Sequence, residues 1–277
     1  MAGVRWRLCP GLVPLALLLG LLAAPLQAET TAAVPVVALI IDDLGQHPRH
    51  GQRIAGLPGP VACAFLPGLP HTRRGARQCH EQGKEVMLHQ PLQAAAANDL
   101  GPGGVTIDMD RDEVIATVTD NLASIPHVSG MNSHMGSLLT RHPGHMLWVT
   151  QALHQFDPNA FFIDSFTTAQ SVAHQIAAET GLAHGRRNVF LDPEPDPEII
   201  EAEFRRWLAL AHRDGVAIAI AHPYPETLEF LETELPHLKD THGVMLVPVR
   251  KAITKQTEVS WPVYSSPSPP AAKSSKP

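Results

Sequence analysis

The chain has 277 residues, a formal net charge of −6, 44% hydrophobic residues and 17% charged residues. This length fits one large α/β domain or two small ones, and the composition excludes a wholly disordered chain. A negative charge disfavours recognition of nucleic acid through a basic surface, so no nucleic-acid partner is expected. The 26 prolines are about twice the usual share, and the 16 histidines are many for this length. Together they suggest ordered loops and a metal site, with most histidines scattered over the surface.

The first 28 residues have the pattern of a secretory signal peptide. Arg5 and Arg7 form a charged start, an apolar run extends from Leu12 to Ala24, and Ala28 closes a plausible cleavage site. The alternative is an uncleaved membrane anchor, but the apolar run is short for a spanning helix. We therefore expect an exported, periplasmic protein with no stable membrane span after cleavage.

A short linker at 29–34 leads into a single predicted domain at 35–254, and a disordered tail rich in proline and serine follows at 255–277. Apolar runs predict strands at Val36–Asp42, Val61–Leu66, Glu85–Leu88, Val128–Asn132, Ala160–Asp164, Val189–Asp192, Val216–Ala221 and Val244–Val247. Periodicity and capping residues predict helices at Thr72–Gln82, Asp110–Ser124, His145–Phe156, Thr168–Thr180, Pro197–Arg213 and Glu226–Glu234.

This alternation of strands and helices indicates a parallel sheet with helices outside it, either a barrel or a doubly wound sheet. The chain contains neither a G-x-G-x-x-G pattern after the first strand nor a Walker pattern, so nucleotide binding is not predicted. One domain is the simplest interpretation.

Ionisable and amide residues follow six of the predicted strands. They are Asp42, Asp43, His89, Asn132, His134, Asp164, Asp192 and His222. The carboxyl ends of parallel strands share one face, and sites are built there. For Asp192 a helix N-cap is an equally good interpretation. The adjacent Asp42 and Asp43 repel each other unless a cation or hydrogen-bond donors compensate.

One aspartate with two histidines and an open position is a familiar ligand set for a hydrolytic divalent metal, most often zinc. Such a metal makes water nucleophilic near neutral pH. A second carboxylate can act as the base, and a separate histidine can protonate the leaving group. The strand-end residues include candidates for each of these roles.

Five short segments resemble motifs of the divergent polysaccharide deacetylase family, a branch of the NodB-like carbohydrate esterase superfamily. They are Ile40–Gly45, Gly83–Leu92, Gly130–Ser137, Ile163–Ser165 and Ala221–Pro223. The similarity extends over about Pro35 to Ala252. It implies a single-domain α/β fold, a distorted parallel (β/α)7-type barrel of the NodB-like deacetylase kind.

The resemblance also implies roles for individual residues. Asp42 would be the catalytic base, while Asp43 and His89 would hold the metal. The family's second ligand histidine, four residues after the first, is replaced here by Gln93. We expect His134 to substitute for it from another strand.

His222 would be the acid, oriented by Asp164, and Arg187 could fill the place of the family's Arg-x-Pro motif. Asn132, Arg187 and Asp192 are the candidate substrate-binding residues.

The predicted function is a zinc-dependent hydrolase that removes N- or O-acetyl groups from an exported or envelope saccharide, or from another small acetylated substrate. The alternative is a non-catalytic periplasmic module that binds glycan or protein on the same fold. Another metal hydrolase, such as an amidase, is a third possibility. The sequence does not identify protein partners.

Two cysteines remain after removal of the predicted leader. Cys63 lies in an apolar run and is expected to be a small buried hydrophobic residue. An oxidising compartment permits a disulfide between Cys63 and Cys79 but does not by itself indicate one.

Overall fold

A computed structural model describes residues 1–3 and 33–260. Residues 4–28 of the predicted leader and the predicted tail beyond residue 260 lie outside the described residues. The last helix, α8 (Val249–Ser260), continues past the predicted domain end at 254, so the tail boundary at 255 is wrong. No helix within the described residues is long and apolar enough to cross a membrane.

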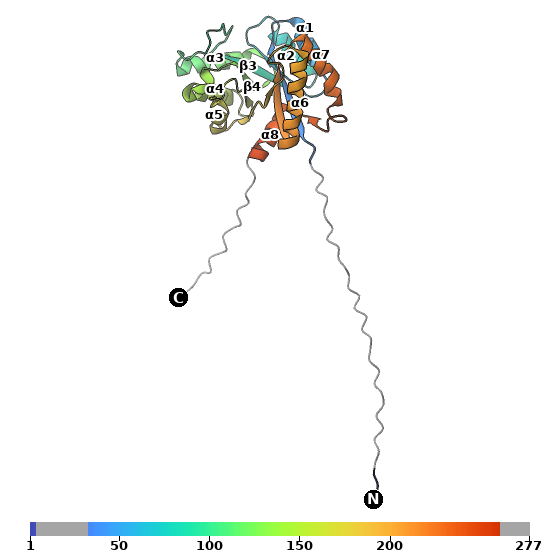
Figure 1. Ribbon diagram of the computed structural model, residues 1–277. Helices are drawn as coiled ribbons and strands as arrows, with labels where there is room; N and C mark the ends of the chain where they lie inside the picture. The colour runs from blue at the N-terminus through green and yellow to red at the C-terminus, as the bar shows by residue number, and fades with distance from the viewer. Residues whose placement is uncertain (4–32, 261–277) are drawn as a thin grey trace, which may run out of the picture. The chain divides into compact units, whose positions relative to one another are not determined.

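The centre of the fold is one parallel sheet (Figure 1). Its strands are β1 (Val36–Leu44), β2 (Ala62–Phe65), β3 (Val86–Leu92), β4 (Val128–Met135), β5 (Phe161–Asp164), β6 (Ala183–Arg186), β7 (Val189–Phe190), β8 (Val216–Ala221) and β9 (Met245–Leu246). The order across the sheet is β6-β5-β4-β3-β2-β1-β8-β7, and β9 pairs with the start of β1. All pairings are parallel, so the strands' carboxyl ends lie at one edge.

Helices cover both faces of the sheet, but unequally. They are α1 (Pro48–Ala55), α2 (Thr72–Glu81), α3 (Arg111–Ser124), α4 (Pro143–Phe156), α5 (Ala173–Glu179), α6 (Pro197–Asp214), α7 (Pro225–Glu234) and α8. Val37 and Leu39 of β1 belong to the core formed with α1–α7, whereas Ala38 and Ile40 belong to a second core with α8. Because β1 is buried on both faces, its run of apolar residues is continuous.

Local signals account for several helix ends. Asp110 and Glu113 form the predicted capping box at the start of α3. Gly215 ends α6 at φ 78°, a backbone conformation that glycine adopts without strain. The helix predicted from Thr168 begins five residues later, at Ala173, because a turn follows β5 first.

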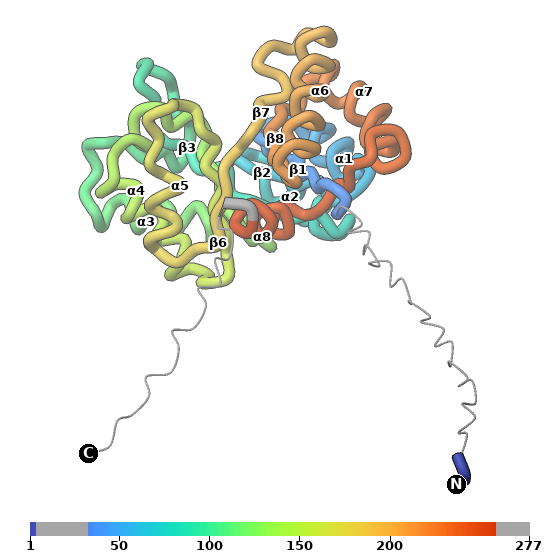
Figure 2. Tube along the Cα trace, turned by 60° about the horizontal axis from the view of Figure 1, so that its bottom comes forward, coloured from blue at the N-terminus to red at the C-terminus, as the bar shows by residue number. Residues whose placement is uncertain are grey.

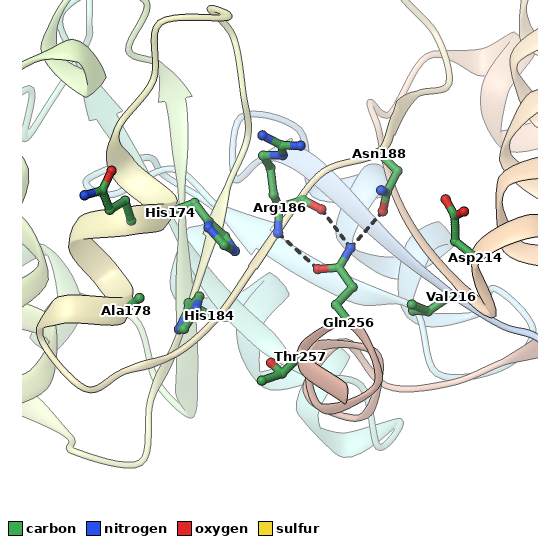
Figure 3. A pocket seen from close by; sticks show the side chains of 10 residues that line it. His174, Ala178, His184, Arg186, Asn188, Asp214, Val216, Gln256 and Thr257 are labelled. Carbon is green, nitrogen blue, oxygen red and sulfur yellow. Dashed lines mark hydrogen bonds between the residues drawn. The ribbon is translucent and has the colours of Figure 1, made fainter. Parts of the chain in front are cut away.

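The sheet does not close into a complete barrel, because β6 and β7 are its two ends. Figure 3 shows the seam between them, where the side chain of Gln256 from α8 reaches across. Its Nε2 donates to the carbonyl of Arg186 (3.1 Å) and to Asn188 Oδ1 (2.8 Å), while its Oε1 accepts from the Arg186 amide (3.2 Å). Asn188 Oδ1 also accepts from the amide of Ile218 in β8 (2.8 Å). Polar side chains therefore bridge the seam where strand pairing is missing, and Figure 2 shows α8 running beside β6 at this place.

The structure answers the question that the sequence left open about the two cysteines. Cys63 of β2 and Cys79 of α2 are both fully buried, and they form a disulfide across 16 residues of chain. The expected burial of Cys63 is confirmed, and the disulfide that the sequence permits without indicating it is present. A loop of this length is worth about 3 kcal/mol of stability in the chain-entropy description.

Candidate metal centre

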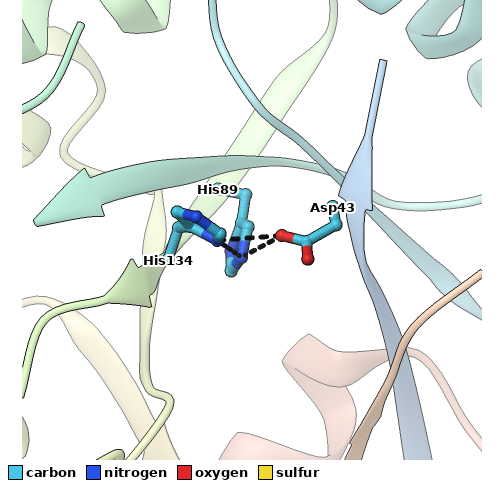
Figure 4. Close-up of side chains that lie close together, drawn as sticks. All are labelled: Asp43, His89 and His134. Atoms are coloured by element: carbon cyan, nitrogen blue, oxygen red, sulfur yellow. Dashed lines mark hydrogen bonds and ion pairs between the residues drawn. The ribbon is translucent and has the colours of Figure 1, made fainter. Parts of the chain in front are cut away.

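The strand-end residues meet at one edge of the sheet, as the sequence predicts. Asp43 lies near the end of β1, His89 in β3 and His134 in β4. In Figure 4 the three side chains point toward one another from three separate strands. Asp42 and His222 line the same cavity of about 370 Å³.

Three ligand atoms converge on one point. Asp43 Oδ1 lies 2.9 Å from His134 Nδ1 and 3.2 Å from His89 Nε2, and the two nitrogens are 3.2 Å apart. Ligands at 2.0–2.1 Å from a tetrahedral zinc ion are about 3.3 Å apart, so the observed spacing is close to that of a zinc site. Asp43 Oδ1 is also buried without a well-aligned hydrogen bond within the described structure. This unsatisfied oxygen, together with two imidazoles, fits a divalent cation.

The backbone is distorted where it presents the ligands. Asp43 has φ 57°, and the pairing of β1 with β2 changes register between Ile41 and Leu44. Met135, directly after His134, also has φ 57°. Non-glycine residues rarely adopt this conformation, and when they do it is often at functional sites. At β1 it allows the adjacent Asp42 and Asp43 to take different surroundings, one almost fully buried and one part-exposed.

Asn132 connects the metal ligands to the predicted base. Its Oδ1 lies 2.8 Å from His89 Nδ1, and its Nδ2 donates to the two oxygens of Asp42 at 2.8 and 3.1 Å. Since the amide oxygen accepts, His89 Nδ1 carries the hydrogen and Nε2 is left to face Asp43 and His134. Asn132 is fully buried, so its predicted role in substrate binding is wrong.

Asp192 is the carboxylate that orients His222. Its Oδ1 lies 3.0 Å from His222 Nδ1, and its Oδ2 accepts from the His222 amide (2.7 Å) and from Thr227 Oγ1 (2.8 Å). Asp192 is 1% exposed, so the predicted contact with substrate is wrong. Thr227 was not predicted, because a threonine in the first turn of α7 has no distinctive sequence pattern.

Asp164 does not contact His222, so its predicted orienting role is also wrong. Its oxygens accept from the amide of Phe166 (2.8 Å) and from Ser171 Oγ (2.9 Å). Asp164 therefore shapes the turn after β5. That turn carries Phe166, at φ 50°, into the wall of the cavity.

Arg187 lines the cavity, as a candidate substrate-binding residue should. Its Nε donates to the carbonyl of Ser165 (2.6 Å) and its Nη2 to the carbonyl of Phe166 (3.0 Å). It makes no hydrogen bond to Asp42 within the described structure, so direct steadying of the base is not observed. Contact between Arg187 and substrate stays a prediction.

Gln93, which replaces the family's second histidine, has a structural role. Its side-chain oxygen accepts from the amide of Ile107 (2.7 Å), and its backbone bonds to Val105, Leu138 and Leu139. It joins the segment after β3 to the loops before α3 and α4. His134 of β4 lies with Asp43 and His89 in the candidate ligand cluster, where the sequence placed it.

Charge and burial set the protonation of the centre. Burial raises the pKa of Asp42, and this outweighs the opposing imidazoles and Asn132. Burial also opposes ionisation of Asp43, but His134 and His89 hold its pKa well below the usual range. Burial lowers the pKa of His89, yet Asp42 and Asp43 together raise it to about 9. A cation that binds here must displace the His89 proton, so its affinity should fall at low pH.

His222 is suited to carry a proton. Burial lowers its pKa, but the hydrogen bond to Asp192 and the charges of Asp42, Asp192 and Asp43 raise it above the ordinary value. Its Nε2 lies 3.8 Å from Asp43 Oδ2 and so faces the metal ligands. The centre thus combines a buried carboxylate, a candidate cation site and an imidazole with a raised pKa around one cavity.

Comparison with known proteins gives a consistent result. The model of the divergent polysaccharide deacetylase family matches residues 39–253. The uncharacterized protein YibQ of Escherichia coli K12 is 33% identical over 210 residues, which are 76% of this chain and 65% of YibQ. An uncharacterized protein of Haemophilus influenzae is 32% identical over 204 residues, 74% of this chain and 72% of that protein. The chain therefore spans about two thirds of the length of these relatives.

Among solved structures, the uncharacterized protein ATU2773 of Agrobacterium tumefaciens C58 has a similar fold. Its TM-score is 0.75 at 21% sequence identity, covering 80% of this chain and 90% of that chain. At this identity the likeness concerns the fold alone. The predicted distorted parallel α/β barrel is confirmed.

Proposed function

Because the chain belongs to the divergent polysaccharide deacetylase family, we propose that it is a zinc-dependent hydrolase that removes N- or O-acetyl groups from a saccharide. The observation that carries the proposal is the convergence of Asp43, His89 and His134 at the cavity that also contains a buried carboxylate and an oriented imidazole. Two imidazoles and one carboxylate form a ligand set that binds zinc in preference to magnesium or calcium.

The chain's own residues divide the work of hydrolysis. A bound zinc ion would polarise the acyl carbonyl and make a water molecule more acidic. Asp42 accepts the proton of the attacking water, and its raised pKa makes it a better base than an exposed aspartate. His222 donates a proton to the departing nitrogen or oxygen, and Asp192 holds the imidazole in the required tautomer.

We also propose that the protein is exported to the periplasm and acts on envelope saccharide. The pattern of residues 1–28 supports export. The Cys63–Cys79 disulfide supports an oxidising compartment, since such bonds are rare in the reducing cytosol.

The test is the metal content and hydrolytic activity of the purified protein. We expect one zinc ion per chain and release of acetate from acetylated chitooligosaccharides or simple acetyl esters. Chelation should abolish release, and added zinc should restore it. A protein that binds zinc but is inert toward every acetylated substrate would instead favour the non-catalytic binding module.

The pairing of His222 with Asp192 predicts a specific pH dependence. Since Asp192 raises the pKa of His222, Asp192→Asn should lower that pKa, and the imidazole would then lose its proton at a lower pH. The alkaline limb of kcat/KM should move to lower pH, with a loss of about 10–100-fold at neutral pH. NMR titration of the His222 ring would check the shift independently of turnover, and an unchanged titration would contradict the assignment. Asp214→Asn, in a surface ion pair with Arg213, is the matched control.

A further inference from the structure

A second cavity adjoins the metal centre. It has a volume of about 310 Å³ and shares Asp43 and His134 with the first cavity. The metal ligands therefore stand between two cavities. The second is walled mainly by apolar side chains, namely Leu66, Pro67, Leu69, Pro91, Leu100 and Pro102.

The two cavities differ in chemistry. The first contains Asp42, His222 and Arg187, together with two phenylalanines and several hydroxyl side chains. This mixture suits a saccharide, which presents hydroxyl groups and apolar ring faces. Neither Asp42 nor His222 lines the second cavity. Among the described residues that line it, Gln46 and Asp99 are the polar ones besides the candidate ligands, and both are exposed at its rim.

The proposed hydrolysis determines which substituent of the acyl carbon lies in each of the two cavities. Water adds its oxygen to that carbon, the bond to nitrogen or oxygen breaks, and the leaving atom takes a proton from His222. The leaving group must therefore lie in the first cavity, within reach of His222, and the attacking water must lie near Asp42. The remaining substituent is the acyl chain, and the open space beyond the metal ligands is the second cavity.

We propose that the second cavity binds the acyl chain, and that the preferred acyl group is an uncharged chain longer than acetyl, of about four to eight carbons. This inference rests on the proposed hydrolytic function and specifies its substrate class. A cavity of about 150 Å³ accommodates benzene, so about 310 Å³ is far more than one methyl group needs. The carboxylate of Asp99 at the rim disfavours an acyl chain that ends in an anion.

The experiment compares chain lengths on the zinc-loaded protein. Hydrolysis of 4-nitrophenyl acetate, butyrate, hexanoate and octanoate gives kcat/KM as a function of length. Binding of alkyl hydroxamates of the same lengths, measured by calorimetry, gives the affinity without turnover. Each buried methylene should strengthen hydroxamate binding about three- to fourfold. Hexanoate should be cleaved at least about tenfold faster than acetate.

Filling the cavity should remove this preference selectively. Leu69→Trp is expected to abolish the gain with chain length, measured as the ratio of kcat/KM for hexanoate to that for acetate. Leu100→Trp, on the loop between β3 and α3, repeats the test should the first variant fail to fold. Leu210→Trp, on α6 and outside both cavities, is the control for the substitution itself.

The outcomes separate this inference from the proposed function. Zinc-dependent acetate hydrolysis with no gain from longer chains would overturn the inference and leave the proposed function standing. A length dependence that persists in both tryptophan variants would also overturn it. An inert protein whose hydroxamate affinity rises with length, and loses the rise in Leu69→Trp, would support the acyl cavity and contradict hydrolysis. A protein that binds no zinc would overturn both.

Discussion

Replacing His89 or His134 by alanine is expected to lower zinc affinity at least ~100-fold. Each variant removes one of the three ligand atoms that lie within 3.2 Å of one another, and Asp43 with a single imidazole is a poor zinc site. Loss of an outer hydrogen-bond partner typically costs 10–100-fold in metal affinity, and loss of a ligand should cost more. The measurement is competition with a chromophoric zinc chelator, with acyl hydrolysis assayed in parallel.

The control for these two variants is His237→Ala, which removes an exposed imidazole of the short 3-10 helix at Leu235–His237. It should bind zinc like the unaltered protein. Asn132→Leu tests the hydrogen bond between Asn132 and the ring of His89. It should weaken zinc binding by about 10–100-fold, which is less than either ligand variant. If both ligand variants bind zinc as tightly as the unaltered protein, the metal site lies elsewhere.

The position of the candidate metal site could be predicted because it depends on one general property of parallel sheets. Asp43, His89 and His134 each follow or end an apolar run, and a parallel sheet brings the ends of such runs to one edge. β1, β2, β3 and β4 are also consecutive in the sheet, so neighbours in sequence are neighbours in space. His134 could thus be expected near His89 even though Gln93 breaks the family's usual spacing.

The partner of His222 could not be predicted, because it depends on the order of the strands. Asp164 and Asp192 both follow short apolar runs, and the sequence does not distinguish them. The sheet places β7 beside β8, so Asp192 lies against His222, while β5 is on the far side of β1. The role of Asn132 could not be predicted for the same reason. The sequence places Asn132 at a strand end, but it does not show that Asn132 links His89 to Asp42.

Two structural features lacked a local signal. α8 packs into the second core with only a few apolar residues, including Val249, Ala252 and Ile253. Its pattern therefore merges into the polar tail, and the domain end is placed too early. The disulfide requires Cys63 of β2 and Cys79 of α2 to face each other, which depends on how α2 packs against the sheet.

Asp42→Asn is expected to leave zinc binding intact and to lower kcat about 10²–10⁴-fold, the range attributed to a positioned general base. The amide is nearly isosteric with the carboxylate, and its oxygen can still accept a hydrogen bond from Asn132 Nδ2, so the orientation of His89 should survive. What disappears is the site that takes the proton of the attacking water.

The pH profile gives the second readout. Burial raises the pKa of Asp42, so in the unaltered protein activity is present above that pKa and is lost as the pH falls through it. Asp42→Asn should remove this acidic limb from the residual activity, whereas a purely structural defect would lower the whole profile and keep its shape. Asp240→Asn, on the exposed surface after the 3-10 helix, should change neither the rate nor the profile. A variant that binds zinc and keeps more than a tenth of kcat would show that another group accepts the proton.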